Sequence, residues 1–268
     1  MNIGPKPAAQ TSWDWRAAGN FIGGGAGGGL VLASVLSGVE GTTLAMLVAV
    51  GGALVGAGLT CVWLEIGRPL RALNVFRNPC TSWMSREAIV ATVLMFTVAC
   101  VVLGVGALAP VAALCALAFV YCQARMIHAS RGIAAWREPR IVPLIVLTAL
   151  AEGAGLLVAT GLAAGWWHAV LVALVVARFA AWIAYRRAIA SAVAPRALSA
   201  LDVAGHVLLV LGTLLPVVLV AWAPAGAGLS AMLAGSYFKF ALVTRAGFNQ
   251  GFALAHVPVR GVPRRMER

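Results

Sequence analysis

The sequence predicts an all-α integral membrane protein with eight transmembrane helices. Of its 268 residues, 62% are hydrophobic and only 10% are charged, whereas soluble domains are about 25% charged. Apolar windows of roughly 18 to 22 residues recur along the chain, about the length that a helix needs to cross ~30 Å of hydrocarbon. These windows are continuous rather than alternating, which excludes a transmembrane β-barrel.

Taken in order, the elements form a single polytopic membrane domain over residues 1–268. A polar tail over residues 1–16 precedes the spans, and a basic tail over residues 245–268 follows them. The expected spans cover residues 17–37, 43–64, 87–108, 110–129, 141–162, 166–187, 201–222 and 227–244. Because the number of spans is even, both termini are expected on the same side of the membrane.

The first span contains the glycine-rich segment FIGGGAGGG. Gly23, Gly25 and Gly28 match G-x-G-x-x-G, but the dinucleotide-binding motif needs a preceding strand within a βαβ unit, and no strand is expected here. The pairs Gly24/Gly28 and Gly25/Gly29 instead have the small-xxx-small spacing that lets a neighbouring helix or ligand approach closely.

The longest polar interruption of the chain lies between the second and third spans, over residues 65–87. It contains four arginines and has a glutamate at each end. Pro69 and Pro79 prevent either flanking helix from continuing through it. A connector with so many arginines is expected to contact another molecule rather than only to join two spans.

Basic residues alternate between the two sets of connectors. Those between spans 2 and 3, 4 and 5, and 6 and 7 contain Arg68, Arg71, Arg77, Arg131, Arg137 and Arg196, whereas the other four contain no Lys or Arg. By the positive-inside rule, this pattern places both termini in the cytoplasm. The net charge of +12 is then explained by topology and an acidic partner, not by nucleic acid.

The ionisable residues of the last four spans include Glu152, Arg178 and Lys239. Glu152 and Arg178 are far from the ends of spans 5 and 6, where charges are costly and usually paired. Two interpretations are open: a structural Glu152–Arg178 ion pair that locks adjacent helices, or a proton relay or quinone contact. Lys239 lies near enough to the end of span 8 for its ammonium group to reach the interface, so we expect no function for it.

Asp202 and His206 are four residues apart near the cytoplasmic end of span 7, so they share a helix face. A carboxylate that orients an imidazole is able to pass protons, and a satisfied polar pair at a helix end is the alternative. Di-haem membrane anchors need paired axial histidines on different helices, and His128 with His206 is the only plausible pair. One haem is conceivable on this pair, two are not supported, and we expect none.

The five cysteines show no C-x-x-C spacing, and four of them lie in or at the edge of apolar spans. Cysteines in such positions are usually small buried hydrophobic residues. We therefore expect no iron–sulfur cluster, no thiolate zinc site and no other metal site in this chain.

Three segments together resemble a known family of membrane proteins. They are LEIGRPLRALNVFRNPCTSWMSRE (64–87), GIAAWREPRIVPLIVLTALAEGAGL (132–156) and KFALVTRAGFNQGFALAHVPVRG (239–261). The family comprises the integral membrane anchors of the DMSO reductase and polysulfide reductase type, found in molybdopterin oxidoreductases. With the opening SWDWRAAGNFIGGGAGGG (12–29), the similarity is greatest to the membrane subunits of phenylacetyl-CoA:acceptor oxidoreductases.

The resemblance implies an eight-helix subunit of a bacterial or archaeal inner membrane, built as two four-helix bundles over residues 17–129 and 141–244. It implies no redox metal in this chain. The partners it implies are a four-cluster ferredoxin-like iron–sulfur subunit and, through it, a catalytic subunit carrying molybdopterin with Mo or W. The anchor would exchange electrons with ubiquinone or menaquinone near the iron–sulfur side of the membrane.

In this family the quinone site lies around the end of span 2 and the start of span 3. Glu65 stands where DMSO reductase anchors have a histidine, and Glu87 matches a glutamate at the start of span 3. Both are expected to deliver protons to the quinone, since its reduction consumes two protons per two electrons. Because Glu65 replaces that histidine, the way in which protons are delivered is open to differ here from that in DMSO reductase anchors.

Further roles follow for the aromatic and basic residues. Trp63 and Trp83 are candidates to stack on the quinone ring, with an interfacial anchor as the alternative for Trp63. Arg68 is a candidate to hydrogen-bond the quinone carbonyls. The remaining quinone-binding candidates are Asp202 and His206, and the candidates for docking the acidic partner are Arg71, Arg77, Arg131 and Arg137.

The expected function is a quinone-reactive membrane anchor that passes electrons between an iron–sulfur subunit and the quinone pool. The expected reaction reduces quinone during oxidation of an acyl-CoA such as phenylacetyl-CoA, with the partner subunits on the cytoplasmic side, where coenzyme A thioesters stay. Two alternatives remain: a purely structural anchor, and a secondary transporter, which inverted repeats with broken helices would support.

Overall fold

The structure, a computed structural model, describes residues 7–65, 69–249 and 251. The regular elements of this part of the chain are helices, joined by turns and loops. Its helices are α1 (Trp15–Leu36), α2 (Gly41–Trp63), η1 (Pro69–Arg77), α3 (Trp83–Val102), η2 (Gly106–Leu108), α4 (Ala109–Ala129), η3 (Ala134–Trp136), α5 (Ile141–Ala159), α6 (Trp166–Ile189), α7 (Pro195–Leu209), η4 (Val210–Leu214), α8 (Leu215–Leu219), α9 (Pro224–Phe240) and η5 (Ala241–Arg245).

The described residues contain eight helical segments long and apolar enough to cross a membrane, as the sequence predicts. The seventh segment runs from α7 through η4 into α8, and the eighth from α9 into η5. Both η4 and η5 are π-helical, a rare local geometry that is frequent at functional sites.

The largest differences from the expected boundaries concern α3 and α7. Helix α3 begins at Trp83 rather than at residue 87, because the Ser82 side chain caps it by accepting a hydrogen bond from the Ser85 backbone N–H (3.3 Å). Helix α7 begins at Pro195 rather than at residue 201, since proline is favoured in the first helical turn.

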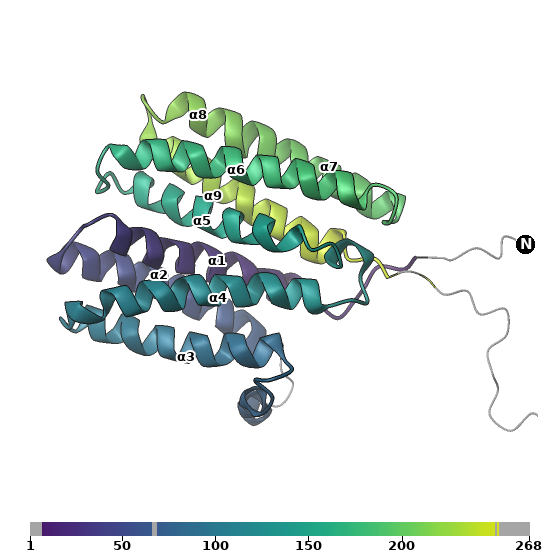
Figure 1. The fold of residues 1–268 in the computed structure, drawn as a ribbon, viewed down its shortest axis with the longest axis horizontal. Helices are drawn as coiled ribbons and strands as arrows, with labels where there is room; N and C mark the ends of the chain where they lie inside the picture. The colour runs from purple at the N-terminus through teal and green to yellow at the C-terminus, as the bar shows by residue number, and fades with distance from the viewer. Residues whose placement is uncertain (1–6, 66–68, 250, 252–268) are drawn as a thin grey trace, which may run out of the picture.

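Helix α1 is the central element of the fold. It packs against α2 and α4 of the first half of the chain and against α5 and α9 of the second half, as Figure 1 shows. Its glycines face all four of these neighbours: Gly23 and Gly27 lie against α2, Gly24 and Gly28 against α4, Gly29 against α5, and Gly25 against Lys239 of α9 and Ala149 of α5. The predicted close approach of neighbouring helices to the glycine-rich segment is confirmed.

The closest of these contacts joins the two halves of the chain. A Cβ on Gly153 of α5 would collide with the backbone of Gly29, and a Cβ on Gly29 would collide with the carbonyl oxygen of Ala149. Helices without a side chain at the contact approach closely enough for backbone-to-backbone packing, which drives association inside a bilayer. The arrangement as two four-helix bundles stays a prediction.

The two described ends of the chain meet at one end of the helices (Figure 1). Ala9 pairs with Phe248, and Ile133 of the α4–α5 connector pairs with Asn249, both in antiparallel fashion. The described part of the expected N-terminal tail is therefore held against the protein. Most of the expected C-terminal tail, residues 252–268, lies outside the described residues.

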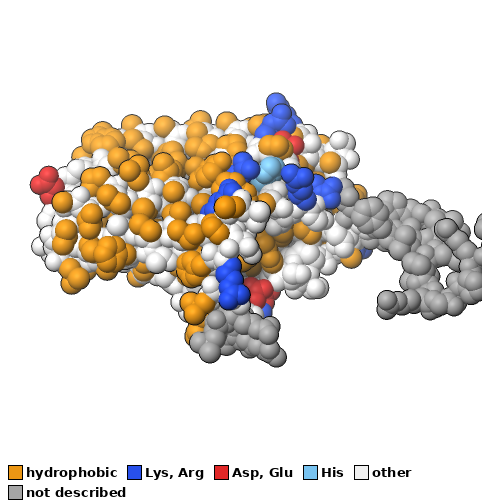
Figure 2. Space-filling model, turned by 60° about the horizontal axis from the view of Figure 1, so that its bottom comes forward, with side chains coloured by type: hydrophobic (Ala, Val, Ile, Leu, Met, Phe, Trp, Pro, Cys, Tyr) orange, Lys and Arg blue, Asp and Glu red, His pale blue; other side chains and the backbone are white. Residues whose placement is uncertain are grey.

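Charged and hydrophobic side chains lie at different positions along the helices on the surface of the protein. On the face drawn in Figure 2, hydrophobic side chains cover most of the length, and the Lys and Arg side chains gather towards the end where the chain termini lie. This distribution agrees with spans in lipid and one basic end. Which side of the membrane that end faces stays a prediction.

Candidate functional site

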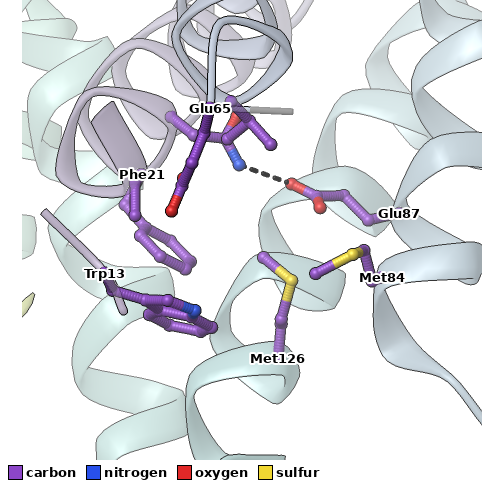
Figure 3. A pocket seen from close by; sticks show the side chains of 9 residues that line it. Trp13, Phe21, Glu65, Met84, Glu87 and Met126 are labelled. Carbon is purple, nitrogen blue, oxygen red and sulfur yellow. Dashed lines mark hydrogen bonds between the residues drawn. The ribbon is translucent and has the colours of Figure 1, made fainter. Parts of the chain in front are cut away.

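A pocket at the basic end brings together both glutamates of the 65–87 segment. Side chains from the N-terminal segment, α1, α2, α3 and α4 line it: Trp13, Ala17, Asn20, Phe21, Val62, Glu65, Met84, Glu87 and Met126. Its cavity volume is about 60 Å³, room for about two water molecules. Figure 3 shows Glu65 and Glu87 extending into this space from different sides.

Glu87 is the inner carboxylate of the pocket. It lies in the first turns of α3 and is 5% exposed. The Asn20 side chain of α1 donates a hydrogen bond from Nδ2 to Glu87 Oε1 (3.2 Å). Because a carboxylate in the interior of a membrane protein is costly, it is usually paired with a polar partner such as this one.

Asn20 is itself held by α4. The Gln123 side chain donates from Nε2 to the backbone oxygen of Asn20 (3.0 Å), and both side chains are almost fully buried. The Oδ1 oxygen of Asn20 is buried without a hydrogen-bond partner in the described structure. A buried acceptor without a partner costs about 1–3 kcal/mol, so this oxygen is suited to accept from a hydroxyl group in the pocket.

Glu65 is the outer carboxylate, directly after the end of α2, and it is partly exposed. Partial burial raises the pKa of Glu65, the nearby Asp14 carboxylate raises it further, and the Arg16 guanidinium opposes this shift. Arg16 pairs with Asp14 (2.8 Å) and donates to the Leu64 backbone oxygen (3.3 Å). The start of α1 is thereby linked to the end of α2 beside Glu65.

The two tryptophans proposed to stack on a quinone do not line this pocket. Trp63 is 49% exposed on the outer surface of α2, which fits its alternative role as an interfacial anchor. The Trp83 ring packs edge-on against Tyr121 (5.9 Å between centroids) and lies under the guanidinium groups of Arg86 and Arg125 (4.3 and 4.7 Å from the centroid). Trp13 and Phe21 supply the aromatic rings of the pocket instead.

Asp202 and His206 lie in the second half of the chain and do not line the pocket. The Asp202 carboxylate pairs with Arg186 (2.6 Å), and the His206 ring hydrogen-bonds through Nδ1 to the Asp202 backbone oxygen (2.7 Å). The Asp202 carboxylate therefore binds the Arg186 guanidinium group rather than the His206 imidazole, which favours the alternative of a polar pair at a helix end.

The predicted docking arginines lie at the basic end. Arg77, Arg131 and Arg137 are exposed there, in η1 and in the α4–α5 connector. Of the other candidate arginines in the 65–87 connector, Arg68 lies outside the described residues, and the side chain of Arg71 is not described. No group of three or more metal-ligating side chains is found among the described residues.

The buried ion pair of the second half differs from the predicted one. Glu152 pairs with Lys239, whose Nζ lies 2.5 Å from Glu152 Oε2 and donates to the Phe21 backbone oxygen (2.9 Å). The predicted Glu152–Arg178 ion pair is therefore wrong, as is the expectation that Lys239 reaches the interface, since Lys239 is only 1% exposed. Arg178 instead donates to the backbone oxygens of Ala231 and Gly212.

Glycines make room for these charged groups. A Cβ on Gly25 would collide with the Lys239 ammonium group, and one on Gly235 would lie 2.6 Å from Glu152 Oε1. The Gly212 carbonyl that binds Arg178 belongs to the π-helix η4, where the hydrogen-bond pattern of the α-helix is interrupted. Sequence periodicity carries no signal for either arrangement.

Sequence reasoning missed three residues that build the pocket: Trp13, Asn20 and Gln123. Asn20 and Gln123 are polar residues inside otherwise apolar spans, which is a usable signal for intramembrane function. Trp13 was assigned to a polar tail, and only the contacts of that segment with the rest of the chain reveal its position.

Comparison with models of known protein families gives a match over the central part of the chain. Residues 39–193, more than half of the chain, match the family model described as DMSO reductase anchor subunit (DmsC). The match covers α2 to α6 and so includes both pocket glutamates. No curated protein matches the chain.

Proposed function

The chain belongs to the DMSO reductase anchor subunit (DmsC) family, and we propose that it passes electrons between an iron–sulfur subunit and quinone at the Glu65–Glu87 pocket. Membership makes it the membrane anchor of a DMSO reductase-type oxidoreductase complex. Its eight apolar spans agree with that assignment. The reaction at the pocket, the quinone and the substrate of the complex are the proposed parts.

One observation carries the proposal: two carboxylates, one directly after α2 and one in α3, line one pocket at the end of the spans. Reduction of a quinone consumes two electrons and two protons, so the site needs proton donors at the boundary between water and lipid. Glu87 is buried and Glu65 is partly exposed. Together they span the distance from the surface to the inside of the pocket.

The chemical groups that line the pocket are complementary to a quinone head group. Asn20 Oδ1, which has no hydrogen-bond partner among the described residues, is suited to accept from a quinol hydroxyl, and Trp13 and Phe21 offer aromatic rings. The volume of about 60 Å³ is below the roughly 300 Å³ of ordinary ligand pockets. Met84 and Met126 line the pocket, and methionine side chains are flexible enough to open it.

The two glutamates divide the work between them. Glu65 exchanges protons with water, and its raised pKa keeps it protonated to a higher pH than an ordinary carboxyl group, which suits a proton donor. Glu87, positioned by Asn20 through Nδ2, holds a proton at the inner end. Gln123 fixes Asn20 and is a positioning residue for the site.

We also propose that the complex oxidises an acyl-CoA such as phenylacetyl-CoA on the cytoplasmic side. The resemblance of residues 12–29, 64–87, 132–156 and 239–261 to phenylacetyl-CoA:acceptor oxidoreductase anchors supports the substrate class. The gathering of Lys and Arg at the end that carries the pocket supports the side. Purification with the catalytic subunit and assay with acyl-CoA thioesters tests both points.

The test uses the whole purified complex. Its iron–sulfur clusters are reduced with a limiting amount of dithionite, a water-soluble quinone analogue is added, and re-oxidation of the clusters is followed by absorbance. Glu87→Gln keeps the size of the side chain but removes the proton, and we expect re-oxidation about 10²-fold slower or more. Glu40→Gln, at the opposite end of α2, is the matched control and should leave the rate unchanged.

The outcomes separate the alternatives. A purely structural anchor predicts no quinone-dependent re-oxidation in the unchanged complex. A transporter predicts that no iron–sulfur subunit purifies with the chain. Quinone-dependent re-oxidation that is unaffected by Glu87→Gln and by Glu65→Gln would place the reaction away from this pocket.

A further inference from the structure

The N-terminal segment is fastened to the basic end by the Gln10 side chain. Gln10 Nε2 donates to the backbone oxygens of Trp13 (2.7 Å) and Val243 (3.1 Å), while Gln10 Oε1 accepts from the Trp13 N–H (2.7 Å). The Gln10 N–H donates to the Gly247 oxygen (2.7 Å). Because four hydrogen bonds tie this residue down, the position of Trp13 is determined by η5 and the segment after it.

Trp13 is the middle ring of an aromatic stack. Its ring lies 4.9 Å from that of Trp136, nearly parallel at 28°, and 5.7 Å from that of Phe21. Trp136 is 2% exposed, and its indole N–H donates to the Leu242 oxygen (3.1 Å). The stack is thus rigid on both sides of Trp13, and it runs from the α4–α5 connector to α1.

A second pocket lies on the other side of Trp13. Its cavity volume is about 220 Å³, and it is lined by Gln10, Ser12, Trp13, Ser130, Arg131, Gly132, Ile133 and Trp136. All of these residues lie outside the membrane spans. Trp13 lines both this hollow and the Glu65–Glu87 pocket, so its side chain borders the surface of the basic end as well as the proposed site of proton delivery.

The rim of the hollow is positively charged. Arg131 is exposed and has no acidic partner among the described residues, and Arg137 donates to the Arg131 backbone oxygen. The nearest carboxylate along the connector, Glu138, already pairs with Arg140 (3.0 Å). An unpaired guanidinium group at the rim of a hollow is complementary to a carboxylate on a protein partner.

We propose that an acidic surface loop of the iron–sulfur subunit occupies this hollow, and that its electrons reach the quinone pocket across Trp13. The inference rests on the proposed function and adds the point at which electrons enter the quinone pocket. Two electrons leave the reduced clusters of the partner, and with two protons they convert quinone to quinol. The protons come from the Glu65–Glu87 side of the pocket, while the electrons come from the Trp13 side.

Docking is tested by site-specific photo-cross-linking in the assembled complex. Gly132 lines the hollow, and a side chain there would meet nothing within 4 Å, so p-benzoylphenylalanine is placed at this position. Gly106, equally free of neighbours and at the opposite end of the spans, is the matched control. We expect a cross-link to the iron–sulfur subunit from position 132 and none from position 106.

The role of the Arg131 charge in docking is tested with Arg131→Glu. The control is Arg196→Glu, because Arg196 is an exposed arginine at the same end of the helices but at the start of α7. We expect Arg131→Glu to lose most of the co-purifying iron–sulfur subunit in moderate salt, and Arg196→Glu to retain most of it. Cross-linking from position 132 to lipid alone, with the subunit still bound, would overturn the docking proposal.

Electron entry is tested with Trp13→Leu and Trp13→Phe at saturating quinone analogue, so that weaker quinone binding does not limit the rate. We expect cluster re-oxidation several-fold slower for Trp13→Leu than for Trp13→Phe, which keeps an aromatic ring. Equal rates for both and for the unchanged complex would overturn the role of Trp13. A cross-link from position 132 in a complex that never reduces quinone would leave the docking site standing and reject the proposed function.

Discussion

Replacing Lys239 by methionine gives the sharpest test of how the second half of the chain is held together. Lys239 Nζ lies 2.5 Å from Glu152 Oε2 and 2.9 Å from the Phe21 oxygen, and both charged side chains are at most 1% exposed. Methionine fills a similar length without the charge. The Glu152 carboxylate then stays in the interior of the protein without its cation.

The expected loss of stability follows from two independent estimates. Breaking a buried ion pair by removing one partner costs about 3–5 kcal/mol. Alternatively, Glu152 takes up a proton, and at pH 7 this costs about 3.7 kcal/mol, because each pH unit above an ordinary carboxyl pKa of ~4.3 costs 1.36 kcal/mol. We therefore expect a loss of about 3–4 kcal/mol, well above the ~0.6 kcal/mol typical of a neutral hydrogen bond between membrane helices.

The assay is thermal or denaturant unfolding of the detergent-solubilised complex. The control is Arg187→Met, an exposed arginine at the end of α6. The penalty of Lys239→Met should shrink as the pH falls towards 4, because protonating the Glu152 carboxylate then costs less. The double variant Glu152→Leu/Lys239→Met should recover most of the loss, because it leaves neither charge buried.

Two results would refute this reasoning. In the first, Lys239→Met is no more destabilising than Arg187→Met, which would mean that Glu152 has another cation. In the second, the double variant loses as much as the two single variants together, which would mean that the two side chains are not coupled.

Two further predictions concern packing and proton supply. Gly153→Ala should lower the free energy of unfolding by about 1–3 kcal/mol, because the added Cβ meets the backbone of α1. Gly106→Ala adds a Cβ in open space and should change the free energy of unfolding by less than about 0.5 kcal/mol. Thermal unfolding of both variants checks these values. Asp14→Asn keeps a good N-cap residue but removes the negative charge that raises the pKa of Glu65. Glu65 then loses its proton at a lower pH, so the fall of quinone reduction at alkaline pH should move to lower pH, and an unmoved pH profile would exclude Glu65 as the donor.

The sequence by itself determined the class of the protein and much of its candidate site. Span length, continuous apolar windows and the uneven distribution of arginines are properties of consecutive residues, so they are readable without a structure. The structure contains the eight expected spans in its described part. Glu65 and Glu87, at the two ends of one connector, line the same pocket.

The tertiary structure decided which side chains face one another across helices. Glu152 and Lys239 are 87 residues apart, and Asn20 and Glu87 are 67 apart. Such partnerships depend on the rotation and depth of each helix, which the glycine contacts of α1 determine through backbone packing. A hydropathy pattern contains neither quantity, because in lipid an apolar helix is almost equally stable at every rotation until its neighbours are in place.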